Sequence, residues 1–257
     1  MRSASVGQQC MDCVGAGARS SRQARTTFGG RPAAGAAVTW TLVAINVAVF
    51  LATWVRPGIV NDLEMFGYAT YPGGHVLHGV AAGEWYRLIT SAFLAPATGL
   101  SGLGFFDILF NMWALIYVGP ALEGLLGRSR FLAVYLLSAV GGSVLYYFLA
   151  PQNAAAVGAS GAIFGLFGAW FVVSKRLRLD TRGIVTLIAI NLALSLFLHN
   201  IIAWQAHIGG LLTGALLTAA YAYAPRRNRS VLQLLATVGV LALIVIAVLV
   251  RNGQLNP

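Results

Sequence analysis

Charged residues are scarce in this chain of 257 residues, because Asp, Glu, Lys and Arg together make up only 9% of it. Soluble globular domains carry about 25% charged residues, so this chain has too few to cover a surface in water. Cysteine is also rare, since Cys10 and Cys13 are the only two, and two cysteines exclude a disulfide framework. Hydrophobic residues make up 58% of the chain. The composition therefore predicts a membrane protein with several spans.

Long apolar runs recur along the chain, and a helix needs about 20 such residues to cross the hydrocarbon core of a bilayer. The runs are continuously apolar and do not alternate every second residue, which predicts helices and not barrel strands. The seven candidate spans are residues 38–55, 105–118, 131–149, 155–173, 183–198, 204–222 and 231–250. We therefore expect an all-α polytopic bundle with seven transmembrane helices.

Positive charge is distributed unevenly between these spans, although the net charge is +10. If the N-terminus lies inside, every Lys and Arg except Arg56, Arg87 and Arg251 falls in a cytoplasmic segment, as the positive-inside rule requires. The excess of Lys and Arg then indicates the orientation of the spans in the membrane. No basic helix or aromatic-interleaved basic stripe indicates nucleic-acid binding. We expect an integral protein of a bacterial plasma membrane, with a cytoplasmic N-terminus and an external C-terminus.

The chain divides into three parts by composition. Residues 1–37 are rich in Gly, Ser, Ala and Arg and are expected to form a flexible basic cytoplasmic arm, with no cleavable signal peptide. Residues 38–224 hold six spans and an external segment, 56–104, in which the aromatic and amphipathic stretch 83–94 is typical of an interfacial helix. Residues 225–257 are expected to form a linker and an extra, accessory C-terminal transmembrane helix.

Three polar side chains in the spans are expected to lie at one depth. Asn111, Ser160 and His207 follow the starts of spans two, four and six, which all run from outside to inside. At about 1.5 Å per residue they lie roughly 5 to 10 Å below the outer surface and can share one cavity. A hydroxyl, an imidazole and a carboxamide are the nucleophile, base and oxyanion donor that acyl transfer requires.

Glycines surround the serine and follow the histidine. On one helix face lie Gly161, Gly165 and Gly168 after Ser160, and Gly210 and Gly214 after His207. Small residues let two helices approach closely, so the hydroxyl can reach the imidazole. Phe164 projects from the same side as Ser160 and can pack against the imidazole ring. Taken singly, a membrane-helix serine, a glycine stripe or a buried histidine is an ordinary packing feature; their conjunction at one depth favours a reactive site.

Five short motifs carry a resemblance to a known family. They are Trp85-Tyr86-Arg87, Leu109-Phe110-Asn111-Met112, Gly119-Pro120-Ala121-Leu122-Glu123, Gly158-Ala159-Ser160-Gly161, and Ala206-His207-Ile208-Gly209-Gly210 with Gly214. From about residue 83 to residue 224 the chain resembles the rhomboid intramembrane serine proteases, and the extra last span resembles their six-plus-one form. The resemblance implies a Ser160–His207 catalytic dyad and oxyanion donors at Asn111 and Gly161. It implies supporting roles for Gly158, Phe164, Gly210 and Gly214.

One position departs from the family pattern. Many rhomboids carry a histidine four residues before the asparagine, where this chain has Asp107. An ionised carboxylate there would repel an oxyanion, and losing one oxyanion donor costs about 2.7 to 4 kcal/mol. Three alternatives remain: Asp107 is protonated, it orients another donor, or the oxyanion is held by Asn111 and the backbone N–H of Ser160 alone.

The resemblance implies an intramembrane serine endopeptidase that hydrolyses peptide bonds in or near transmembrane segments of membrane proteins, without a cofactor. Its partners are then membrane-protein substrates and the lipid bilayer. Asp107 favours an alternative, a catalytically weak or silent rhomboid-like protein that binds client helices. A small-solute channel or transporter would predict inverted repeats or broken helices, and the sequence has no convincing repeat.

Other residues of interest are weaker candidates. Cys10 and Cys13 make half of a zinc knuckle, whereas a closed zinc site needs four ligands, so no metal site is expected. His75 and His78 form a His-x-x-His without neighbouring Cys or carboxylate ligands. His199, at the outer end of span five, is a rival base that ranks below His207 because no glycine face accompanies it. Asn46 and Asn191 are interpreted as interhelical hydrogen-bonding residues.

Overall fold

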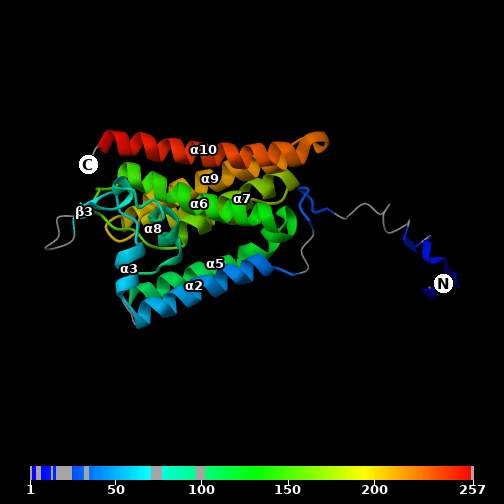
Figure 1. Cartoon of the computed structure of the whole chain (residues 1–257), viewed down its shortest axis with the longest axis horizontal. Coiled ribbons are helices and arrows are strands. Elements are labelled where there is room, and N and C mark those ends of the chain that lie inside the picture. The colour runs from blue at the N-terminus through cyan, green and yellow to red at the C-terminus, as the bar shows by residue number, and fades with distance from the viewer. Residues whose placement is uncertain are drawn as a thin grey trace.

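The fold is seen in a computed structural model (Figure 1), which describes residues 2–3, 7–12, 14–15, 25–31, 35–70, 77–96 and 102–255. Cys13 and His75 lie outside these ranges. Seven helices overlap the seven predicted spans, and the all-α membrane fold is confirmed. They are α2 (Ala37–Val55), α5 (Leu103–Leu126), α6 (Arg128–Leu149), α7 (Ser160–Leu177), α8 (Arg182–Phe197), α9 (Trp204–Tyr223) and α10 (Arg229–Leu255). The fourth span was predicted to begin at residue 155, but its helix begins at Ser160.

Four of these helices, α2, α5, α6 and α10, are long and apolar enough to cross a membrane, and α8 is a shorter apolar helix. The count of seven crossings stays a prediction. Helix α5 is longer than the predicted span 105–118, because it continues through Pro120 to Leu126. A proline inside a helix removes one backbone hydrogen bond. Leu122 and Leu126 are fully buried beyond it, and this packing favours continuation of the helix.

Helices α6, α7 and α9 pack against one another at the centre of the bundle. In Figure 1, α2 and α5 lie side by side along one edge and α10 runs along the opposite edge. Glycines make the central crossings close, since a Cβ on Gly141 would overlap Thr213 and one on Gly165 would overlap Ser138. Lipid provides no hydrophobic drive for helix association, so such van der Waals packing holds the helices together.

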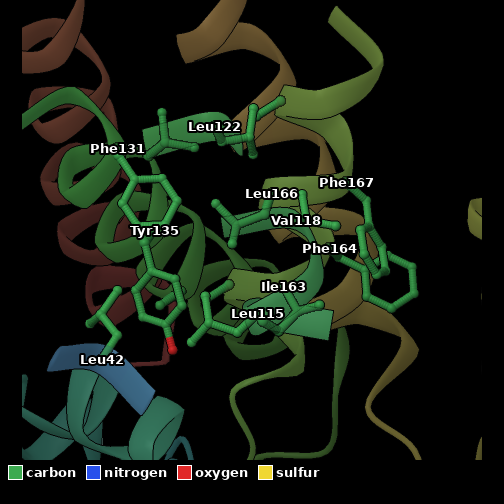
Figure 2. Close-up of a cluster of buried hydrophobic side chains, with 14 of the residues drawn as sticks. Leu42, Leu115, Val118, Leu122, Phe131, Tyr135, Ile163, Phe164, Leu166 and Phe167 are labelled. Carbon is green, nitrogen blue, oxygen red and sulfur yellow. The ribbon is translucent and has the colours of Figure 1, made fainter. Parts of the chain in front are cut away.

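Large apolar side chains fill the space between α2, α5, α6 and α7, as Figure 2 shows. Tyr135 is a fully buried member of this cluster, and its hydroxyl is 3.4 Å from Nδ2 of Asn46. Asn46 thus has the interhelical partner that was expected. The other labelled members are Leu42, Leu115, Val118, Leu122, Phe131, Ile163, Phe164, Leu166 and Phe167. Phe164 joins the cluster to the candidate site, which lies at its edge.

The described part of the segment 56–104, which we call the external segment after its predicted location, folds into several short elements. It contains α3 (Gly58–Leu63), β3 (Ala69–Thr70) paired with β4 (Leu77–His78), η1 (Val80–Ala82), α4 (Arg87–Thr90) and η2 (Ser91–Phe93). Residues 83–94 are therefore not one interfacial helix. The reason is Arg87, which is only 2% exposed. Its Nη1 donates to the carbonyl oxygens of Asn61 and Glu64, so the segment folds around this side chain.

Glu84 is the second anchor of this segment. Its Oε2 accepts hydrogen bonds from Nε of Arg87 at 2.6 Å and from the Gly79 N–H at 2.7 Å, and its Oε1 lies 2.9 Å from Nδ1 of His78. Desolvation raises the pKa of Glu84, but these three hydrogen bonds together outweigh it and hold the pKa below its ordinary value. The carboxylate therefore stabilises the folded segment.

Glu84→Gln is expected to destabilise the protein by about 2 kcal/mol at neutral pH, because a charge-assisted hydrogen bond to Arg87 is lost. A carboxylate whose pKa falls on folding contributes stability above its unfolded pKa, about 4.3, and loses it as the pH falls through the folded pKa. The difference between parent and variant should therefore shrink on acidification. Thermal unfolding in detergent from pH 7 to pH 3 measures it. Asp62→Asn, which changes an exposed carboxylate of the same segment, is the control, and an equal loss in both variants would contradict the prediction.

The external segment also holds the connection that precedes α7. Met65 and Ala156 exchange two backbone hydrogen bonds, and the Gly67 N–H donates to the carbonyl oxygen of Gln152. Through these contacts the segment fixes residues 152–156, which lead directly to Ser160.

Residues 25–31, within the stretch expected to be a flexible arm, pack against the bundle. Phe28 is buried, and its carbonyl oxygen accepts a hydrogen bond from Nε2 of Gln233 on α10. The same amide nitrogen donates to the carbonyl oxygen of Tyr221 on α9, and Nε of Arg130 on α6 donates to Oε1 of Gln233. Gln233 thus joins the arm to three helices.

Two further short strands, β1 (Arg2–Ser3) and β2 (Gln8–Gln9), pair with each other, and η3 (Arg226–Asn228) precedes α10.

Candidate active site

Ser160 and His207 meet where α7 and α9 begin. Ser160 is the first residue of α7 and His207 lies in the first turn of α9. Nε2 of His207 is 2.8 Å from Oγ of Ser160. The Phe164 ring stacks on the imidazole with centroids 4.1 Å apart and planes 12° from parallel. A nucleophile and a base at this separation are the arrangement that hydroxyl activation requires.

The turn before Ser160 depends on Gly158. Its φ is 130°, a backbone conformation that favours glycine, and its N–H donates to the carbonyl oxygen of Ser91 in the external segment. The turn places Ser160 at the start of α7, where no side chain caps the helix. Backbone N–H groups in the first turn of a helix lack intrahelical acceptors and bind anions. The N–H groups of Ser160 and Gly161 are therefore available to an oxyanion beside the hydroxyl.

The close crossing of α7 and α9 depends on the predicted glycine faces. A Cβ on Gly210 would overlap the carbonyl oxygen of Gly161, and a Cβ on Gly214 would overlap that of Gly165. The backbones can approach to this distance only because both positions lack a side chain. This approach sets the separation of the Ser160 hydroxyl and the His207 imidazole.

Asn111 lies on α5 next to Asp107. Its Nδ2 donates to the carbonyl oxygen of Asp107 at 2.8 Å and lies 3.1 Å from Oδ1 of the same residue. The carboxamide nitrogen thus has two acceptors on Asp107, one on its backbone and one on its side chain. Of the alternatives for Asp107, this geometry matches the one in which it orients the asparagine. Asp107 and Ser160 both border Gly158, so the carboxylate lies close to the nucleophile turn.

A cavity of about 1010 Å³ surrounds these residues and includes Asp107, Asn111, Ser160, Gly161 and His207 in its wall. Helix α5 contributes aromatic side chains to the wall and α8 contributes aliphatic ones; they are Phe106, Phe110, Trp113, Tyr117, Ile184, Leu187 and Leu194. A largely apolar wall with a few convergent polar groups is typical of a binding site, and here it suits an apolar peptide segment.

Ser195 is a member of the site that the sequence analysis missed. It lies in the last turn of α8, and its Oγ is 2.7 Å from Nδ1 of His207. No motif marks Ser195, and the only signal is that Asn191 and Ser195 are two polar residues four apart in an apolar helix. The side chain of Asn191, which was expected to bond a neighbouring helix, instead donates to the carbonyl oxygen of Leu187 in its own helix and lines the cavity.

The remaining candidates lie away from this site. His199 is exposed and is not part of the cavity wall. His78 contacts Glu84 in the external segment. Among the residues that the structure describes, no three His, Cys, Asp or Glu side chains gather as metal ligands would.

Comparisons with known proteins point to one family. Residues 82–224 match the rhomboid domain. YdcA of Bacillus subtilis (strain 168) is 42% identical over 145 residues, which cover 54% of this chain and 69% of YdcA. Rhomboid protease GluP of the same organism is 32% identical over 212 residues, which cover 80% of this chain but only 39% of GluP. Rhomboid protease AarA of Providencia stuartii is 26% identical over 223 residues, 75% of either chain.

Proposed function

Because the chain belongs to the rhomboid family, we propose that it is a serine endopeptidase that cleaves membrane proteins in or near their transmembrane segments. Ser160 is the nucleophile and His207 the general base. The observation that carries the proposal is the 2.8 Å separation of Oγ and Nε2 in the wall of a cavity between apolar helices. The chain spans less than half of GluP, so activity and substrates are proposed for this chain on its own residues.

In the first step Oγ of Ser160 attacks the scissile carbonyl carbon and its proton passes to Nε2 of His207. The N–H groups of Ser160 and Gly161 donate to the resulting oxyanion. Collapse of the tetrahedral intermediate breaks the C–N bond, and His207 returns the proton to the leaving amine. A water molecule then gives a proton to His207 and attacks the acyl carbon, the bond between this carbon and Oγ breaks, and His207 returns the proton to Oγ of Ser160.

Asn111 contributes a third oxyanion donor in this proposal, as its position in the cavity wall supports. Its carboxamide turns one hydrogen from Asp107 toward the oxyanion, and Asp107 keeps the other. The proposed topology follows the distribution of charge: seven spans, a cytoplasmic arm over residues 1–37, a six-helix core over 38–224, and an extra helix within 225–257 that ends outside. In a bacterial plasma membrane, the dyad then faces the outer leaflet.

The proposal predicts that a fluorophosphonate probe labels the purified protein in detergent. Ser160→Ala should abolish labelling because the attacking oxygen is gone, and His207→Ala should reduce it to near background because the proton has no acceptor. Ser174→Ala is a matched control, since Ser174 is a buried serine of the same helix outside the cavity wall. Equal labelling of the parent and Ser160→Ala would refute the assignment.

A second candidate function is favoured by the contacts of Asn111. Because its carboxamide nitrogen already has two acceptors on Asp107, Asn111 is a poor oxyanion donor in this candidate, and the chain would be a catalytically weak or silent rhomboid that binds client helices. This candidate predicts a folded parent that the probe does not label above the Ser160→Ala level. It also predicts that Asp107→His increases labelling, because the variant removes the carboxylate acceptor of Asn111 and keeps only the backbone acceptor of residue 107.

A further inference from the structure

Ser195 makes two short contacts with its single hydroxyl. Oγ lies 2.7 Å from Nδ1 of His207 and 2.6 Å from the carbonyl oxygen of Asn191, one helical turn earlier. The side chain is 2% exposed, so solvent has little access to either contact. Nδ1 is on the opposite side of the imidazole ring from Nε2, the atom that contacts Ser160.

The direction of these hydrogen bonds follows from the number of hydrogens. A carbonyl oxygen has none, so the hydrogen in the contact with Asn191 must come from Ser195. A serine hydroxyl has only one hydrogen, and in the contact with His207 the oxygen of Ser195 therefore accepts. Nδ1 of His207 must then carry a hydrogen. In the neutral ring this leaves a lone pair on Nε2, which accepts from the hydroxyl of Ser160.

We infer that Ser195 is a positioning residue that holds His207 in the tautomer able to accept the proton of Ser160. The kinetic effect of Ser195 rests on the proposed proteolytic function. The tautomer of His207 does not, because it is a property of the resting protein. The opposite tautomer would place a hydrogen on Nε2 and leave the ring unable to act as a base toward Ser160. The hydrogen bond also fixes the plane of the ring, which Phe164 holds from one face.

Ser195 has a second effect after proton transfer. The doubly protonated imidazolium keeps its hydrogen bond from Nδ1 to Oγ of Ser195, and a charged donor makes this bond stronger than in the neutral ring. Ser195 thereby favours the charged form of His207 that arises during acylation. A neutral hydroxyl does this less strongly than a carboxylate would.

The kinetic test compares Ser195→Ala with Ser195→Thr, in which a hydroxyl is kept that can also bond the carbonyl oxygen four residues earlier. We expect Ser195→Ala to lower kcat about 10- to 100-fold with little change in KM. Its acid limb of kcat/KM should move to lower pH, because the imidazolium loses an acceptor. Ser195→Thr should stay within a few fold of the parent. Thr186→Ala, which removes an exposed hydroxyl from the same helix, is the control.

Three results would overturn the inference: parental kcat and pH profile in Ser195→Ala, equal losses in the alanine and threonine variants, or an equal loss in Thr186→Ala. A second measurement does not depend on activity. Nitrogen-15 NMR of histidine-labelled protein should show hydrogen on Nδ1 of His207 in the parent and a mixture of tautomers in Ser195→Ala. If the parent cleaves nothing yet carries this hydrogen, the proposed function fails and the positioning role stands. A parent with hydrogen on Nε2 removes the positioning role.

Discussion

Ser160→Ala and His207→Ala are each expected to lower kcat/KM for a membrane-protein substrate by about 10⁴-fold or more. Without Oγ no acyl intermediate forms, and without the imidazole the hydroxyl loses the base that lies 2.8 Å from it. The double variant should be no worse than either single variant, because the two groups act in one step. Cleavage of a fluorogenic transmembrane peptide in detergent micelles measures all three.

Folding must be held constant in this comparison. Circular dichroism should agree between the parent and the variants. Thermal unfolding should agree for Ser160→Ala, since Ser160 is half-buried and, in the part of the chain that the structure describes, its side-chain hydrogen bond is with His207. Ser174→Ala should retain parental kcat/KM. Losses that multiply in the double variant would show that Ser160 and His207 act independently, contrary to a dyad.

Gly210→Ala is expected to have the second largest effect, because its new Cβ would overlap the carbonyl oxygen of Gly161. The atom in the way belongs to the backbone of α7 and has no rotamer that relieves the clash, so α9 must move away. Overpacking in a closely packed region costs about 1 to 3 kcal/mol, and we expect the upper end here. A displacement of about 1 Å between reacting groups lowers catalysis about 100-fold, so activity should fall even where the variant still folds.

Unfolding in detergent together with kcat/KM measures both consequences. Gly239→Ala on α10 is the matched control, since nothing lies within 4 Å of the position of its Cβ. In a helix interior alanine is favoured over glycine by about 1 kcal/mol, so this variant should be equally or more stable and fully active. Parental stability and activity in Gly210→Ala would mean that the α7–α9 crossing is looser than described.

The helices and the meeting of Ser160 with His207 could be inferred from sequence because both leave periodic signals. Continuous apolar runs mark membrane helices, and glycines at intervals of three and four residues mark the face on which α7 and α9 cross. The end of α5 could not be inferred, since Gly119 and Pro120 indicate a helix end. The buried side chains of Leu122 and Leu126, which continue the helix past them, act only in the folded bundle.

The other features depend on contacts and side-chain orientations that exist only in the folded protein. Ser195 reaches His207 only because α8 lies against the start of α9, and a lone serine in an apolar helix does not reveal that approach. Asp107 could be recognised as a departure from the family, but its hydrogen bonds with Asn111 depend on the orientation of the two side chains. The prediction of one interfacial helix over residues 83–94 was wrong for a similar reason. An aromatic, amphipathic stretch is typical of a helix at a membrane surface, but here the chain folds into short elements around the buried side chain of Arg87.

The hydrogen bonds that join Gln233 to Phe28, Tyr221 and Arg130 have a practical consequence for shortening this protein. A chain that begins at Ala37 keeps every predicted span, but it lacks the Phe28 carbonyl oxygen. One hydrogen of the buried Gln233 amide then has no acceptor, which lowers the free energy of unfolding by about 1 to 3 kcal/mol. Fusion partners and purification tags therefore belong upstream of Arg25, and trimming for expression should stop there. The last helix and the N-terminal tail share this residue, so a cut at one terminus weakens the attachment of the other.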